Sequence, residues 1–134
     1  MWLIPRTGLV LLVVTFIGLQ SCQTAEQRAR IAELQALAQE LPKYPDFKQV
    51  RYADISKPDI ATVTYYYKSP TGFESVKEFY KKELLARGWT EEKREGWWVY
   101  SDDPATFRKG NYKFVLTGDD TLMWQYTIDL SWRS

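Results

Sequence analysis

The segment Leu122–Arg133, LMWQYTIDLSWR, has the most regular pattern in the chain. Large apolar residues occupy every second position; they are Leu122, Trp124, Tyr126, Ile128, Leu130 and Trp132. The positions between them hold Met123, Gln125, Thr127, Asp129, Ser131 and Arg133. Successive side chains of a β-strand point to opposite faces, so this alternation predicts a strand with one buried face and one face in water. Such strands are typical of antiparallel sheets.

Further strands are predicted on both sides of a helix. Tyr112–Thr117 is expected to pair with the last strand across Gly118–Thr121. Ile60–Lys68, IATVTYYYK, is dense in β-branched and aromatic residues, and Phe47–Ala53 shows a weaker alternation. A hairpin around Glu95-Gly96 is expected from Trp89–Glu95 and Trp97–Ser101, with a turn or loop over Asp102–Thr106.

One helix is predicted between these strands. Thr71 is the expected N-cap, with Glu74 at the third helical position. The apolar stripe of the helix consists of Phe73, Val76, Phe79, Tyr80 and Leu84. Gly88 stands where a left-handed C-cap residue belongs. Together these elements predict an α+β domain over residues 44–134, a mostly antiparallel sheet with one helix packed on one face.

The first 22 residues have the layout of a secretory signal peptide. A short start with one arginine precedes Thr7–Leu19, an uncharged and almost wholly apolar run of 13 residues. A membrane span needs about 20 apolar residues, so this run is short for one. We expect residues 1–21 to be removed. An uncleaved N-terminal anchor and a buried helix remain alternatives.

The apolar run ends beside Cys22, the single cysteine of the chain. The quartet Leu19-Gln20-Ser21-Cys22 resembles the lipobox of bacterial lipoproteins, although Gln20 departs from the small or β-branched residue usual there. The resemblance implies that Cys22 is lipidated and anchors the protein in a membrane, facing away from the cytoplasm. Gln23 does not resemble an inner-membrane retention signal, which implies the outer membrane if the cell is Gram-negative.

Residues 24–41 form a predicted helix between the cysteine and the domain. They are rich in good helix formers, and Thr24 with Gln27 has the spacing of a capping box. A stripe of Ile31, Leu34, Leu37, Ala38 and Leu41 follows helical spacing, and Pro42 ends the helix. We interpret residues 22–43 as a lipidated cysteine with a helical tether. Packing of this helix on the domain, or against a partner helix, is the alternative.

Composition argues against several classes of function. Basic and acidic residues number 18 and 17, so the basic excess typical of nucleic-acid binding is absent. The chain has no histidine, which removes most acid–base dyads, catalytic triads and zinc sites. Asp102-Asp103 and Asp119-Asp120 lie where turns are expected. We therefore predict no enzyme activity, no metal and no cofactor.

The segment Val76–Trp89, VKEFYKKELLARGW, preceded by Tyr44-Pro45 and a strand, carries a second resemblance. It is similar to a module of exported bacterial proteins whose helix has adjacent Phe-Tyr, then Leu, then Gly-Trp. That module has no assigned reaction. The resemblance therefore implies fold and export, with Phe79, Tyr80, Leu84 and Trp89 as packing residues.

The aromatic residues suggest a binding surface. Tyr66 is expected on the wet face of the sheet with Lys68 and Gln125, and Trp98 is expected opposite its neighbour Trp97. These four residues are the candidate binding residues, for an envelope protein or a glycan. An ordinary wet sheet face is the alternative. The expected function is a non-catalytic binding or assembly lipoprotein of the cell envelope; the alternative is an accessory subunit of a membrane complex, docking through helix 24–41 or the open sheet face.

Overall fold

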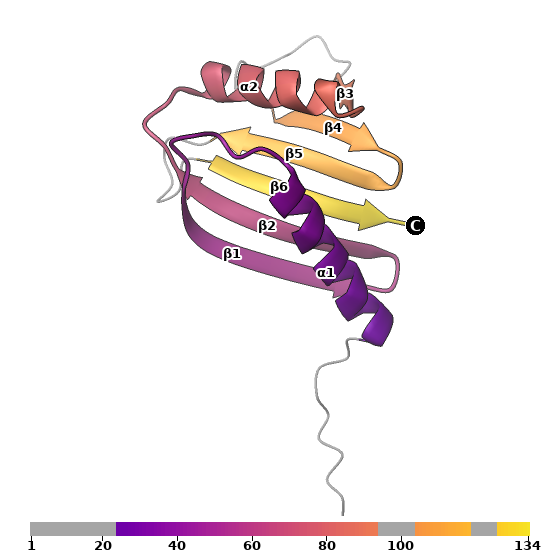
Figure 1. The fold of residues 1–134 in the computed structure, drawn as a ribbon. Helices are drawn as coiled ribbons and strands as arrows, with labels where there is room; N and C mark the ends of the chain where they lie inside the picture. The colour runs from indigo at the N-terminus through magenta and orange to yellow at the C-terminus, as the bar shows by residue number, and fades with distance from the viewer. Residues whose placement is uncertain (1–23, 94–103, 119–125) are drawn as a thin grey trace, which may run out of the picture.

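A computed structural model of the chain describes residues 24–93, 104–118 and 126–134 (Figure 1). The elements in these ranges are α1 (Ala25–Glu40), β1 (Lys48–Lys57), β2 (Ile60–Lys68), α2 (Phe73–Ala86), β3 (Thr90–Glu92), β4 (Ala105–Lys109), β5 (Tyr112–Gly118) and β6 (Tyr126–Arg133). The strands form one sheet in the order β1-β2-β6-β5-β4-β3, and every neighbouring pair is antiparallel. The predicted α+β class with a mostly antiparallel sheet is confirmed.

Strand β6 lies in the middle of the sheet, between β2 and β5 (Figure 1). Ile128 is opposite Tyr65 of β2 on one side and Leu116 of β5 on the other. Directly opposite residues of an antiparallel pair share a face, so the apolar set of β6 continues across its neighbours. The predicted pairing with Tyr112–Thr117 is confirmed. Residues 122–125 of the predicted strand lie outside the described residues.

The hydrophobic core lies on one side of the sheet. Its strand residues come from β2, β6, β5 and β4; those that are buried are Ala61, Val63, Tyr67, Tyr126, Ile128, Leu130, Phe114, Leu116, Ala105 and Phe107. The helices cover them with Ile31 and Leu34 from α1 and with Val76, Tyr80 and Leu84 from α2. Burial of such aliphatic side chains stabilises the fold by about 1.5–3 kcal/mol each.

The ends of α2 agree only in part with the prediction. Gly88 has a φ of 84°, and Trp89 N–H donates to the carbonyl of Leu84, so the predicted left-handed cap is confirmed. The prediction of Thr71 as N-cap was wrong, because Gly72 holds that position and provides no side-chain cap. The Thr71 hydroxyl donates instead to the Asp46 carboxylate, tying this loop to the start of β1.

Only the first strand of the predicted hairpin around Glu95-Gly96 lies among the described residues, and there it pairs with a strand that was not predicted. Strand β3 is short and pairs with β4, with Glu91 opposite Phe107. Strand β4 begins at Ala105, inside the stretch that was predicted as a turn or loop. Buried Ala105 and Phe107 alternate with more exposed Thr106 and Arg108, which is a short strand signal that the sequence prediction missed. The predicted strand over 97–101 lies outside the described residues.

Strand β1 is longer than predicted and contains a bulge. Its pairing with β2 shifts between Gln49 and Arg51, so one extra residue, Val50, interrupts the regular alternation. Gln49 is opposite Tyr67 on the helix-covered face, whereas Arg51 is opposite Tyr66 on the other face. The bulge therefore places Arg51 beside Tyr66, which simple alternation along Phe47–Ala53 did not predict.

Helix α1 packs on the sheet, so its interpretation as a free tether was wrong. The predicted capping box of Thr24 and Gln27 is confirmed. The helix crosses β6, β2 and β1 (Figure 1). Its own side chain Leu34 is fully buried. Gln35 Nε2 also donates to the Tyr52 hydroxyl at 2.8 Å. The apolar stripe of α1 is buried against the sheet of the domain itself. One face of the sheet therefore carries two helices, α1 and α2.

Within the described part of the chain, neither α1 nor α2 combines the length and the apolar character needed to cross a bilayer.

We predict that Leu34→Ala lowers the free energy of unfolding by about 2–5 kcal/mol, because it leaves a cavity between α1 and the sheet. Urea titration followed by circular dichroism measures the change. Leu85→Ala is the matched control, since Leu85 is 46% exposed on α2, and it is expected to change stability by about 0.5 kcal/mol or less. Equal, small effects of the two substitutions would mean that α1 does not pack on the domain.

Candidate functional site

Two of the predicted site residues lie on the sheet face that the helices leave uncovered. Tyr66 and Lys68 belong to β2 and share a face with Thr62 and Thr64. We call this side of the sheet the open face. Three other predicted residues, Cys22, Trp98 and Gln125, lie outside the described residues, so their positions relative to Tyr66 remain predictions.

Tyr66 is half-buried on the open face and contacts a cation. The guanidinium carbon of Arg51 lies 5.3 Å from the centroid of the Tyr66 ring, within the range of a cation–π interaction. The ring is flanked by Arg51 on β1 and Thr127 on β6. The sequence prediction missed Arg51, because only the bulge in β1 brings it to this face.

The open face carries more positive than negative charge among the described residues. By strand register its basic residues are Lys48, Arg51, Lys57, Lys68, Arg108, Lys113 and Arg133, and its acidic residues are Glu92 and Asp129. Glu92 forms an ion pair with Arg108 across the β3–β4 pair, which neutralises both. The remaining residues at the centre are mainly threonine, serine and valine. The surface therefore suits an anionic partner that also offers hydrogen-bonding groups.

Asp129 is the half-buried acid of this surface. It lies on β6 with Thr64 and Val115 directly opposite on the adjacent strands. The Thr64 hydroxyl donates to Asp129 Oδ1 at 2.5 Å. Burial raises the pKa of the Asp129 carboxyl above its ordinary value, and the hydrogen bond from Thr64 opposes that rise. The sequence pattern placed Asp129 on the wet face of β6 without indicating that its neighbours remove water from it.

The neighbouring glutamates Glu91 and Glu92 do not form a pair of facing carboxylates. Glu91 and Glu92 are adjacent in β3 and therefore point to opposite sides of the sheet. Glu91 faces α2, where its carboxylate lies 3.5 Å from the ammonium of Lys81. Glu95 lies outside the described residues. In the described ranges no three His, Cys, Asp or Glu side chains converge as a metal-binding group.

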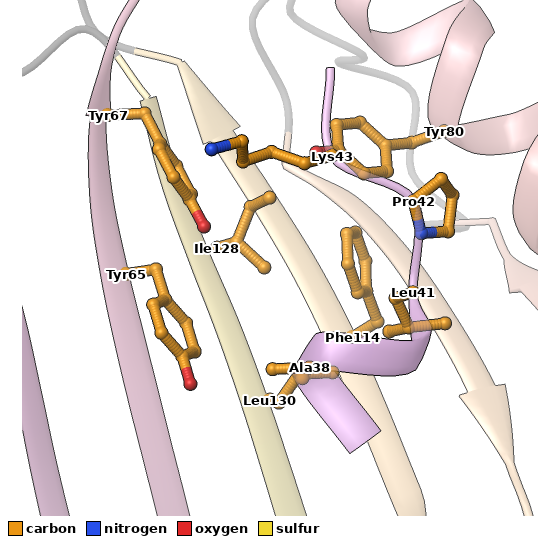
Figure 2. Close-up of a pocket in the computed structure, with 10 residues that line it drawn as sticks. All are labelled: Ala38, Leu41, Pro42, Lys43, Tyr65, Tyr67, Tyr80, Phe114, Ile128 and Leu130. Carbon is orange, nitrogen blue, oxygen red and sulfur yellow. The ribbon is translucent and has the colours of Figure 1, made fainter. Parts of the chain in front are cut away.

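A small pocket lies on the helix-covered side of the sheet (Figure 2). It is bounded by Ala38, Leu41 and Pro42 at the end of α1 and by the rings of Tyr65 and Tyr67 on β2. Figure 2 shows the two tyrosine hydroxyls directed toward the pocket. Burial raises the pKa of Tyr67 to about 12, so its hydroxyl stays protonated at neutral pH.

The volume of this pocket argues against a ligand site. It encloses about 70 Å³, which is less than half of the ~150 Å³ of an engineered cavity that admits benzene. The open face is the better candidate for a functional surface.

The chain matches no protein-family model, no curated protein and no solved structure. The functional proposal therefore depends on the residues and on their geometry. Among the described residues, the open face combines positive charge, an aromatic ring and hydrogen-bonding side chains.

We predict that Asp129→Asn stabilises the protein at neutral pH. The raised pKa means that the folded state holds the Asp129 proton more tightly than the unfolded state, so its contribution is present below pH 3.8 and is lost as the pH rises through the folded pKa. The asparagine cannot ionise and still accepts the Thr64 hydrogen bond. Urea unfolding across this pH range measures the difference, which is expected to vanish at the acidic end. Exposed Asp59→Asn is the control, and equal pH profiles for both variants would contradict the burial of Asp129.

Proposed function

We propose that the protein is an exported lipoprotein, held in a membrane by acyl chains on Cys22, whose domain is a non-catalytic binding module of the cell envelope. The anchor is inferred from the apolar run Thr7–Leu19 and from the lipobox-like end at the single cysteine. The binding role is inferred from the open face. Neither helix of the described ranges covers this face, which therefore offers a broad surface on which a partner can dock.

The observation that carries the binding proposal is the composition of that face. Arg51 and Tyr66 form a cation–π pair on it, and Lys68 is exposed beside them. Most other central positions are short polar residues that leave the backbone plane accessible. Positive charge of this density steers an anionic partner toward the surface and fixes its orientation.

The alternative role, an accessory subunit of a membrane complex, retains support only in one of its two forms. Docking through helix 24–41 would need the apolar stripe of α1, and Ile31 and Leu34 of that stripe are buried against the sheet. Docking through the open face remains available. A subunit role is therefore a special case of the same binding surface, with a membrane protein as the partner.

We predict that the mass of the membrane-extracted protein corresponds to residues 22–134 plus acyl groups. Cys22→Ser is expected to abolish both the acyl mass and the removal of residues 1–21, since the thiol is the acceptor in lipoproteins that this segment resembles. Intact-mass spectrometry measures both changes. Ser21→Ala, which keeps a small residue beside the cysteine, is the control and is expected to be processed normally. An unmodified full-length mass for the native chain would refute the anchor.

We predict that a photo-reactive residue at Thr64, on the open face, cross-links a discrete partner in intact cells. The same residue at Glu78, which is exposed on α2, is expected to give no such product. Lys68→Glu should weaken the cross-link several-fold, because charge reversal repels an anionic partner. Lys82→Glu reverses an equally exposed lysine on α2 and is the matched control. A product from Glu78 alone, or equal effects of the two lysine variants, would place the binding surface elsewhere.

A further inference from the structure

The sheet has one long edge and one short edge (Figure 1). Strand β3 forms the short edge with 3 residues, and two of its side chains are held in ion pairs, Glu91 with Lys81 and Glu92 with Arg108. Strand β1 forms the other edge with 10 residues, and in the described part of the chain no strand pairs with its outer side. An edge strand presents a row of backbone N–H and C=O groups on which a further strand can pair.

The part of β1 that is suited to such pairing is Arg51–Lys57. The bulge at Val50 interrupts regular pairing before this stretch, whereas the register with β2 runs through it without a shift. The stretch contains neither glycine nor proline. Its Ile55 is 55% exposed, more than any other exposed large hydrophobic residue of the described ranges. A strand added to this edge would cover part of that apolar side chain, which favours the pairing.

The charges of this stretch follow a regular pattern. Arg51 and Lys57 lie on the open-face side of β1, about 20 Å apart along an extended strand. Ile55 lies on the same side between them. Asp54 lies on the opposite side, because its partner in β2 is Val63 of the core. A strand paired with this edge would therefore meet two cations and an isoleucine on one face and a carboxylate on the other.

This pattern disfavours a second copy of the chain as the added strand. Antiparallel pairing of Arg51–Lys57 with the same stretch of another copy, in full overlap, would set Arg51 opposite Lys57 at both ends and Asp54 opposite Asp54 in the middle. Like charges directly opposite one another destabilise a strand pair. An extended segment with an acidic residue at each end and a basic residue in the middle would instead form an opposite-charge pair at each of these positions.

We propose that the outer edge of β1 binds an extended segment of a partner protein, which adds to the 6-stranded sheet as a further strand. The segment carries two acidic residues that contact Arg51 and Lys57, a basic residue midway that faces Asp54, and an apolar residue that covers Ile55. Recognition of this kind takes its affinity from main-chain hydrogen bonds and its selectivity from alternate side chains. Strand pairing at this edge requires neither docking on the open face nor a lipid anchor.

Fluorescence anisotropy of the full chain in mild detergent with the labelled peptide Glu-Thr-Val-Lys-Val-Thr-Glu tests the pairing. We expect saturable binding, and at least about tenfold weaker binding of the charge-reversed peptide Lys-Thr-Val-Glu-Val-Thr-Lys, because every charged pair becomes repulsive. Of two versions of the first peptide that are N-methylated on alternate residues, only the one whose methyl groups point away from β1 is expected to bind. Equal binding of both N-methylated versions or of the charge-reversed peptide, or no binding of the first peptide, would overturn the proposal.

Charge-reversal variants locate the peptide on the edge. Lys57→Glu is expected to weaken binding about tenfold. Lys82→Glu reverses an equally exposed lysine on α2 and is expected to change nothing. Lys68→Glu reverses an exposed lysine of the open face that lies outside Arg51–Lys57. A large effect of Lys68→Glu without an effect of Lys57→Glu would assign the peptide to the open face and overturn pairing at the edge.

Two further measurements test the geometry and the occupant. With the peptide bound, hydrogen exchange is expected to slow at alternate backbone amides of residues 51–57, since only every second N–H of an edge strand points outward. Protection elsewhere with none in this stretch would contradict the pairing. Sedimentation velocity without peptide is expected to give a monomer, and a dimer that Ile55→Lys disperses would assign the edge to a second copy and overturn the proposal.

Discussion

The insertion of β6 between β2 and β5 is the constraint on which the rest of the structure depends. β6 joins the hairpin β1–β2, which lies some sixty residues earlier in the chain, to the sheet half that contains β5, β4 and β3. Its register aligns Leu130 with Val63 and Phe114, and Asp129 with Thr64 and Val115. A shift by one residue would exchange the two faces, burying the carboxylate and exposing the leucine. The core and the open face are thus set by the same register.

The burial of α1 changes how the domain relates to a membrane anchor. A free helix of sixteen residues would allow the domain to move some 24 Å from its attachment point, at about 1.5 Å per residue. With Ile31 and Leu34 packed on the sheet, the folded domain begins within two residues of Cys22. An acylated Cys22 would therefore hold the domain directly at the membrane surface.

The two faces of the sheet differ in the kinds of side chain that they carry. The helix-covered face supplies stability, through a continuous set of aliphatic and aromatic side chains such as Leu130, Phe107 and Phe114. The open face contributes less to burial and is instead rich in charge and hydroxyl groups. Asp129 at the centre of this face is half-buried even so, and that burial raises the pKa of its carboxyl. In the proposed binding role, the selectivity of this face would depend on the positions of the charges of Arg51 and Lys68.

Local pattern was sufficient for those features whose cause is local. The alternation in β2 and β6, the stripe of α2, the cap at Gly88 and the capping box of Thr24 all follow from the nearest neighbours in the chain, and each was predictable. Other features depend on residues distant in sequence: whether the stripe of α1 meets a sheet, which strand β3 pairs with, where the bulge in β1 directs Arg51, and how Arg30 comes to stack on Trp132. Sequence periodicity specifies which side of an element is apolar, but not which surface covers it. Which surface covers an apolar face is decided only when residues distant in sequence pair, because the free energy of burying that face depends on all the elements that pack together.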